Sequence, residues 1–239
     1  MNKIKKMILS IVLILSSTIV YAADYNATLG NMPVYAESKD KGVLVDLVKE
    51  IQKESGNSIN IKVLPFASSL YMVQKNRSDF HIPLIKNDIV DVNKLPFTYS
   101  SETIFHVNFV IYSLKNKKID INNLAQYKIE TDRAHVAYFP FKTNASNSIS
   151  GSLSKINDGK IDAFIFADFA TDPYLKESKF KNLSRELYKV FDVKMVLPKS
   201  AKAKQIDTML STSISNLKQS GKYQEIMGKI DLAYSDWQP

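Results

Sequence analysis

The chain has 239 residues, a formal net charge of +8 and no cysteine. The absence of cysteine excludes disulfide bonds, thiol catalysis and cysteine-zinc sites, so stability must come from the burial of apolar side chains. The lysines are scattered and interleaved with Asp and Glu, which is typical of a solvated cationic surface rather than of a nucleic-acid-binding patch.

Residues 1–22 have the pattern of a secretory signal peptide. A lysine-rich start precedes an apolar run at residues 7–20, and a small-x-small cleavage signal ends at Ala22. The run is shorter than the roughly 20 apolar residues of a spanning helix and contains Ser and Thr, so an uncleaved anchor is the less favoured alternative. No cysteine follows the cleavage signal, which excludes a lipoprotein anchor. We therefore expect export to the periplasm and cleavage near Ala22.

The first half of the remaining chain alternates strands and helices. Residues 42–55 place Leu44, Leu47, Val48 and Ile51 on one face of a helix, because their spacing follows the helical period. Runs rich in β-branched residues predict strands around this helix. The predicted order is a strand at 24–33, the helix at 42–55, a strand at 57–66, a helix at 68–76 and a strand at 79–85. This order with short links predicts an α/β unit with a mainly parallel sheet.

The pattern begins again after a polar break at residues 115–118, which we interpret as the boundary of a second lobe. A β-rich run at 105–112 leads into this break. The almost wholly apolar run at 161–167 is typical of a strand covered on both faces. The other predicted elements are a helical turn at 122–127, a strand at 128–131, a helix that includes 138–141, a helix at 150–157, a strand at 189–197, and a terminal helix that follows residues 198–200 and is broken at Gly221.

Four segments in this order carry a resemblance to a known family. Residues 42–47 read Gly-Val-Leu-Val-Asp-Leu, residues 76–80 read Asn-Arg-Ser-Asp-Phe, residues 153–163 follow Leu-x-x-Ile-x-x-Gly-x-Ile-Asp-Ala, and residues 217–226 follow Leu-x-x-Ser-Gly-x-Tyr-x-x-Ile. Each segment is weak alone, and Asn76 stands where the family usually has Gly. Together they resemble the bacterial extracellular solute-binding proteins of family 3, which are the periplasmic receptors of polar amino-acid ABC importers.

The resemblance implies a two-lobed α/β fold, the type II periplasmic-binding-protein fold. Each lobe is expected to be a mainly parallel sheet flanked by helices, and two crossing strands join the lobes around a ligand-binding cleft. The implied division is a signal peptide at 1–22, the first part of lobe 1 at 23–110, lobe 2 at 111–192, and a return to lobe 1 at 193–239.

The loops that follow the strands are the candidate ligand contacts. The carboxyl ends of parallel strands meet at the cleft, and helix N-termini there present free N–H groups. In lobe 1 these loops contain Tyr35, Phe66, Ser68 and Tyr99. The resemblance implies that an aromatic residue packs on the ligand, and Phe66 occupies that position. The alternative for the aromatic residues is an ordinary place in the core or on the surface.

In lobe 2 the candidates are Thr131, Arg133 and Asp168. Arg133 follows a predicted strand and can clamp a carboxylate, and the alternative is that it pairs with a neighbouring acid. The resemblance implies an acid that grips the ligand's amino group at the end of the strand at 161–167. That position is Ala167, and the acid follows as Asp168. A shift of one residue reverses the face to which a strand residue points.

A second departure concerns the ligand's carboxylate. The family's amino-acid receptors have an Arg between the strand at 79–85 and Tyr99, whereas residues 86–94 contain no Arg. Lys86 can supply a positive charge but not the two-pronged geometry of a guanidinium. The implied acid for the ligand's amino group and the implied Arg for its carboxylate are both altered in this chain. The sequence therefore leaves the identity of the ligand open.

Catalytic and metal-binding motifs are absent from the sequence. The three histidines, His81, His106 and His135, are far apart and lack a metal-ligand spacing. We therefore predict a monomeric, non-enzymatic solute-binding protein without metal or cofactor, which captures a small polar solute such as an amino-acid-like molecule, organic acid or amine for the permease of an ABC importer. The alternatives are a sensor that docks on a membrane receptor and, less favoured, a small-molecule dehydratase that uses His135 near Asp132 and Arg133.

Overall fold

The structure is a computed structural model that describes residues 23–239. The predicted signal peptide at residues 1–22 lies outside the described residues. No helix within residues 23–239 has both the length and the apolar character that a membrane crossing requires.

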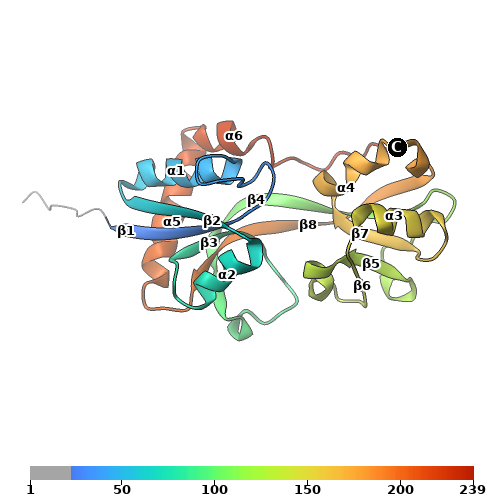
Figure 1. The fold of residues 1–239 in the computed structure, drawn as a ribbon, viewed down its shortest axis with the longest axis horizontal. Helices are drawn as coiled ribbons and strands as arrows, with labels where there is room; N and C mark the ends of the chain where they lie inside the picture. The colour runs from blue at the N-terminus through green and yellow to red at the C-terminus, as the bar shows by residue number, and fades with distance from the viewer. Residues whose placement is uncertain (1–22) are drawn as a thin grey trace, which may run out of the picture.

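Two α/β lobes are joined by two long strands, β4 (Phe97–Leu114) and β8 (Leu183–Pro198) (Figure 1). Lobe 1 contains β1 (Asp24–Gly30), α1 (Val43–Ser55), β2 (Ser58–Leu64), α2 (Phe66–Gln74), β3 (Phe80–Ile85), η1 (Val92–Lys94), α5 (Ala203–Gln219) and α6 (Lys222–Met227). Lobe 2 contains η2 (Leu124–Gln126), β5 (Ile129–Asp132), η3 (Arg133–Tyr138), β6 (Asn144–Ser146), α3 (Ile149–Asn157), β7 (Ala163–Ala167), α4 (Asp168–Leu175) and η4 (Ser178–Phe180).

The strands form one eight-stranded sheet with the order β2-β1-β3-β8-β4-β7-β5-β6. The pairs β1–β2, β1–β3, β5–β6 and β5–β7 are parallel, as expected for each lobe, whereas β8 pairs antiparallel with β3 and β4, and β4 pairs antiparallel with β7. The predicted α/β architecture is therefore confirmed. The two lobes share one mixed sheet because β4 and β8 stay paired along almost their whole length.

The helices of lobe 1 follow the predicted pattern. Leu44, Leu47, Val48 and Ile51 of α1 are fully buried, and α1 packs against α5 and α6. Gly221 separates α5 from α6 in a left-handed conformation with a φ of 78°, which glycine adopts without steric cost. The break predicted at this residue is confirmed.

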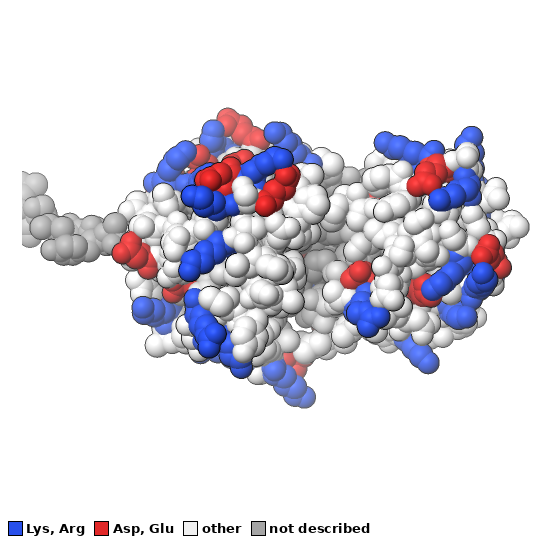
Figure 2. Space-filling model, in the orientation of Figure 1, with Lys and Arg blue, Asp and Glu red and all other residues white. Residues whose placement is uncertain are grey.

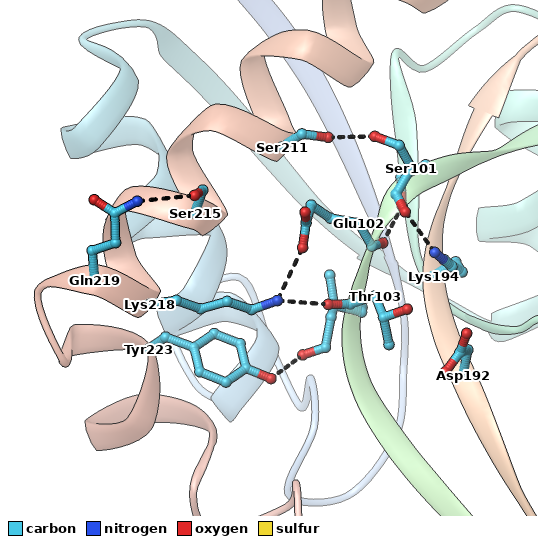
Figure 3. Close-up of polar contacts among 12 residues, drawn as sticks. Ser101, Glu102, Thr103, Asp192, Lys194, Ser211, Ser215, Lys218, Gln219 and Tyr223 are labelled. Carbon is cyan, nitrogen blue, oxygen red and sulfur yellow. Dashed lines mark hydrogen bonds and ion pairs between the residues drawn. The ribbon is translucent and has the colours of Figure 1, made fainter.

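Strand β4 begins eight residues before the predicted strand, at Phe97 rather than at Phe105. The sequence did not predict this part of the strand, because the segment from Thr98 to Thr103 is polar and lacks the apolar pattern of a buried strand. Its register against β8 shifts on both sides of Thr103, and α5 and β8 cover the bulge with polar contacts (Figure 3). Lys194 Nζ donates to Ser101 O at 2.6 Å, and Lys218 Nζ lies 2.9 Å from Glu102 Oε2. The Lys194 contact joins β8 to β4, and the Lys218 contact holds α5 on β4.

Lobe 2 differs from the predicted elements in several places, and β8 begins at Leu183, six residues before the predicted strand at 189–197. The expected helix around 138–141 is a 3-10 helix, η3, that ends at Tyr138, because Phe139 turns back into an extended conformation and is buried. The short strand β6 and the helix α4 were not predicted. Helix α4 has a weak apolar stripe, in which Thr171 and Leu175 are the buried residues, and contains Pro173, so its sequence gave little periodic signal.

The last residues of the chain leave lobe 1 and run along the molecule to lobe 2 (Figure 1). At the start of this tail, Asp231 accepts hydrogen bonds from the backbone N–H of His106 at 3.0 Å and from the Tyr223 hydroxyl at 2.8 Å. At its end, Gln238 exchanges hydrogen bonds of 3.0 and 2.8 Å with the backbone of Arg185 on β8. The predicted division placed residues 193–239 with lobe 1, whereas this tail touches both lobes.

The buried side chain of Arg185 holds the end of the tail. Its guanidinium lies 4.9 Å from the ring centre of Tyr234 and 4.7 Å from that of Trp237, and it donates to the Trp237 carbonyl at 3.1 Å. On its other side it pairs with both carboxylate oxygens of Asp172 at 3.1 and 2.9 Å. Arg185 is 3% exposed, so this pair lies in the interior of lobe 2.

We expect Arg185→Ala to lower the free energy of unfolding by about 3 kcal/mol, because it leaves a largely buried carboxylate without its partner. The same variant should release the tail, and limited proteolysis should then cut within residues 231–239 faster than in the wild type. Urea unfolding followed by circular dichroism measures the stability change. Arg77→Ala is the matched control, since Arg77 is exposed, and it should change stability by less than about 0.5 kcal/mol. Equal effects of the two substitutions would contradict this account.

Candidate functional site

A cavity of about 540 Å³ lies between the two lobes. On the face drawn in Figure 2 the surface is hollowed between the lobes, and charged side chains gather mainly on the outer parts of both lobes. Lobe 1 and the crossing strands line the cavity with Met32, Tyr35, Phe66, Ala67, Leu70, Pro83, Leu84, Ile85, Phe105, Val107, Phe109 and Val193, and lobe 2 lines it with Ala134, His135, Tyr138, Phe166, Ala167 and Phe169. Its size is within the range of small-molecule sites.

Tyr35 forms part of the wall and touches both lobes. Its ring centre lies 5.7 Å from that of Phe105 on β4 and 5.3 Å from that of Phe169 on α4. Burial, together with the nearby carboxylate of Asp168, raises the pKa of Tyr35 far above its usual value. The hydroxyl therefore stays protonated and remains a hydrogen-bond donor at physiological pH.

Two glycines make room for the two aromatic residues of lobe 1 in the wall. Gly42 has a φ of 137°, and a Cβ there would lie 2.4 Å from the Tyr35 carbonyl oxygen. A Cβ on Gly30 would lie 2.4 Å from the Phe66 ring. The glycine that precedes α1 therefore allows the Tyr35 loop to pack against the helix, where Tyr35 O accepts a hydrogen bond of 2.9 Å from Leu44 N.

In lobe 2, His135 stands among aromatic rings. Its ring centre is 5.4 Å from Phe109, 5.5 Å from Phe166 and 5.3 Å from Tyr138. His135 Nδ1 lies 3.4 Å from Asp132 Oδ1. The proximity of His135, aided by the backbone N–H of Ala134, lowers the pKa of Asp132.

The lobes touch at a few places beside the cavity. The Tyr35 and Phe169 rings are in contact. Asn87 Nδ2 donates to the Ala137 carbonyl at 3.0 Å, and the Tyr138 hydroxyl lies 3.4 Å from the Ile85 carbonyl. These contacts are few and local, so the crossing strands carry most of the connection between the lobes.

Among the lobe 1 residues predicted as ligand contacts, Tyr35 and Phe66 line the cavity. Ser68 is exposed on α2 and does not line it. The Tyr99 hydroxyl accepts a hydrogen bond of 3.2 Å from Asn87 N, and its ring packs on Phe97 at 5.4 Å, outside the cavity wall.

The three lobe 2 residues predicted as ligand contacts are engaged elsewhere in the protein. Thr131 is fully buried, and its hydroxyl donates to the Ile165 carbonyl at 2.7 Å. Arg133 donates to Asn147 Oδ1 at 3.2 and 2.8 Å on the surface. Asp168 accepts hydrogen bonds from Asn108 Nδ2 at 2.9 Å and from Phe169 N at 2.7 Å.

The end of β7 explains the position of Asp168. Ala167, the last residue of the strand, is the one that lines the cavity, and Asp168 begins α4. The cavity wall therefore has a methyl group at the position where the family resemblance implies a carboxylate.

Sequence reasoning missed most of the aromatic wall. Phe105, Val107 and Phe109 alternate along β4 and line the cavity together. The sequence analysis identified this segment only as part of a β-rich run at 105–112. The rest of the aromatic wall comes from lobe 2, with Tyr138 on η3, Phe166 on β7 and Phe169 on α4. No local signal in the sequence identifies these residues as neighbours of Phe109.

Neither a metal centre nor a nucleophilic dyad faces the cavity in the described part of the chain. Residues 23–239 contain no group of three or more His, Asp and Glu that could hold a metal ion. Ser69 Oγ and His81 Nδ1 are 2.6 Å apart, but both residues are fully buried beneath Phe66, whose ring meets the imidazole edge-on at 5.2 Å. This pair supports the wall rather than reaching a ligand.

Several solved structures are similar to this one. The probable amino-acid ABC transporter extracellular-binding protein ytmK from Bacillus subtilis is 15% identical, covers 87% of this chain and 97% of its own, and has a TM-score of 0.62. A histidine kinase sensor domain with similarity to periplasmic binding proteins is 12% identical over 86% of this chain and 95% of its own, with a TM-score of 0.61. The GluR0 ligand-binding core from Nostoc punctiforme, in complex with L-glutamate, is 17% identical, covers 87% of this chain and 100% of its own, and has a TM-score of 0.59.

These similarities confirm the periplasmic-binding-protein fold that the sequence predicted, and at such identities they concern the fold alone. The chain matches no protein-family model, and no curated protein matches it. Membership of family 3 therefore stays a prediction.

The pH dependence of stability provides a test of the support beneath Phe66. Burial lowers the pKa of His81 to about 4, whereas in the unfolded chain it is about 6.5. Between these two pKa values the unfolded state binds a proton at His81 that the folded state does not. The contribution of neutral His81 to the free energy of unfolding is therefore complete above pH 6.5 and is lost as the pH falls toward 4.

We therefore expect the wild type to lose on the order of 3 kcal/mol between pH 7 and pH 4 through His81 alone. Urea unfolding of the wild type and of His81→Gln across this range measures the contribution, since the variant should lack it. Ser69→Ala is the control, because it removes a hydrogen-bond partner and leaves the titrating group in place. A constant stability difference between the wild type and His81→Gln at every pH would contradict the assignment.

Proposed function

We propose that this protein is a periplasmic solute-binding protein that captures a small molecule between its lobes and presents it to the permease of an ABC importer. The observation that supports the proposal most strongly is the cavity of about 540 Å³ lined by both lobes. A site between two lobes that are connected by two strands can open and close by hinge motion around a ligand. The predicted signal peptide is consistent with this role.

A sensor role is the second candidate. The similarity to a histidine kinase sensor domain is as strong, by TM-score, as the similarity to a transporter binding protein, 0.61 against 0.62. The ligand-binding step is the same in both roles, and the difference lies in the membrane partner.

We propose that the protein is not an enzyme. The dehydratase alternative depended on His135, Asp132 and Arg133 acting together, but Arg133 is hydrogen-bonded to Asn147 on the surface. His135 reaches the cavity among aromatic rings, whereas its neighbour Asp132 accepts from the N–H of Ala134 and does not line the cavity. Incubation of the protein with its ligand should return the ligand unchanged, as judged by mass spectrometry.

A thermal-shift screen with apolar as well as polar small molecules tests ligand capture. At a concentration of 100 Kd a ligand stabilises the native state by about 2.7 kcal/mol, which raises Tm by about 5–10 °C. We expect Phe66→Ala to weaken the affinity for the best compound at least tenfold, because the ring lines the cavity. Arg133→Ala should leave the affinity within twofold of the wild type. The reverse pattern would place the ligand at Arg133 rather than in the cavity.

Deletion of the gene distinguishes the importer from the sensor. If the protein serves an importer, uptake of the radiolabelled ligand should fall to background in the deletion strain. Uptake should return when the wild-type gene is restored, but not when the Phe66→Ala gene is supplied. Normal uptake together with a lost transcriptional response to the ligand would instead support the sensor.

A further inference from the structure

We infer that the cavity takes an uncharged, mainly apolar ligand with an aromatic ring rather than a zwitterionic amino acid. This inference rests on the proposed function and specifies its ligand class. Seven of the lining side chains are aromatic, Tyr35, Phe66, Phe105, Phe109, Tyr138, Phe166 and Phe169. Most of the others are aliphatic, so the wall favours ring stacking and apolar contact.

The lining contains no Lys, Arg, Asp or Glu within residues 23–239. A ligand ammonium or carboxylate that enters such a cavity loses its hydration and gains no opposite charge. The cost of an unpaired buried charge is several kcal/mol, which exceeds what one or two neutral hydrogen bonds return. The wall therefore selects against both charged groups of an amino acid.

The ionised side chains around the cavity are already paired within the protein. Asp168 accepts from Asn108 at 2.9 Å, and Arg133 donates to Asn147 at 2.8 Å. Asp88, next to the Asn87 contact between the lobes, forms ion pairs with Lys86 at 3.1 Å and Lys189 at 2.8 Å. Each of them is therefore already held by a contact within the protein.

The two helical segments of lobe 2 that begin beside the cavity each have an aspartate at their start. Asp168 accepts from the N–H of Phe169 in the first turn of α4 at 2.7 Å, and Asp132 accepts from the N–H of Ala134 in η3 at 2.9 Å. Each aspartate occupies a donor and adds a negative charge at the place where a helix start would otherwise attract a carboxylate. Both effects oppose an acidic ligand.

The polar side chains of the wall are hydrogen-bonding groups that carry no carboxylate, ammonium or guanidinium. They are the hydroxyls of Tyr35 and Tyr138 and the imidazole of His135. Burial raises the pKa of both tyrosines, so their hydroxyls stay uncharged. This set can orient a ligand with one hydroxyl or one ring N–H.

A series of four indoles that differ in charge tests the inference. Tryptophol is neutral, tryptamine is a cation, indole-3-acetate is an anion, and L-tryptophan is a zwitterion, while all four have the same ring. Isothermal titration calorimetry with the purified wild type should show tryptophol binding at least tenfold more tightly than each of the others. Equal or tighter binding of L-tryptophan, indole-3-acetate or tryptamine would overturn the inference.

Two substitutions place the binding in the cavity. Phe169→Ala should weaken tryptophol binding at least fivefold, and it carries little folding risk because Phe169 is 48% exposed. Tyr71→Ala is its matched control, since Tyr71 is equally exposed and lies outside the cavity wall. An equal loss in both variants would overturn the placement.

Ala167→Asp introduces the carboxylate that the wall lacks. We expect this variant to lose tryptophol affinity and to bind tryptamine at least tenfold more tightly than the wild type does, whereas Ala125→Asp on the exposed surface of η2 should change neither affinity. If no indole binds the wild type but an amino acid raises its Tm, the inference is overturned and the proposed function stands. If no small molecule of any class raises the Tm, the proposed function itself is wrong.

Discussion

The antiparallel pairing of β4 with β8 is the interaction on which the rest of the structure depends. The pairing runs from Phe97 opposite Pro198 in lobe 1 to Leu114 opposite Leu183 in lobe 2. Because the parallel strands of each lobe attach to the outer edges of this pair, the two lobes become parts of one sheet. The alternation of β4 then turns Phe105, Val107 and Phe109 toward the cavity.

Charge in this protein is placed where it holds the lobes, not where a ligand would lie. Arg185 and Asp172 form a buried pair in lobe 2, and the Tyr112 hydroxyl donates to the same carboxylate at 2.7 Å. Lys194 and Lys218 secure the bulge of β4 in lobe 1 (Figure 3). A buried ion is tolerated only with partners of good geometry, so Arg185 and Lys194 have a structural role. The cavity between them is left to aromatic and aliphatic side chains.

The local elements of lobe 1 could be predicted because each has a strong short-range signal. Leu44 to Ile51 show the helical period, and Gly221 marks the break between the two terminal helices. The polar start of β4 and the weak stripe of α4 show no such signal, because pairing with β8 and packing on lobe 2 determine these elements. Of the candidate site, the sequence identified Tyr35 and Phe66 through their loops and missed the contributions of β4, β7 and α4.

The sequence by itself determined the α/β class and the order of most elements, since these depend on residue types and short spacings. Only the tertiary structure decided which residues line the cavity between the lobes. Ala167 faces the cavity while Asp168 turns to Asn108, and Arg133 turns to Asn147, because strand faces and hydrogen-bond partners are set by segments distant in the chain. The apolar wall likewise forms only when strands and helices from both lobes meet, and no single segment of the sequence contains it.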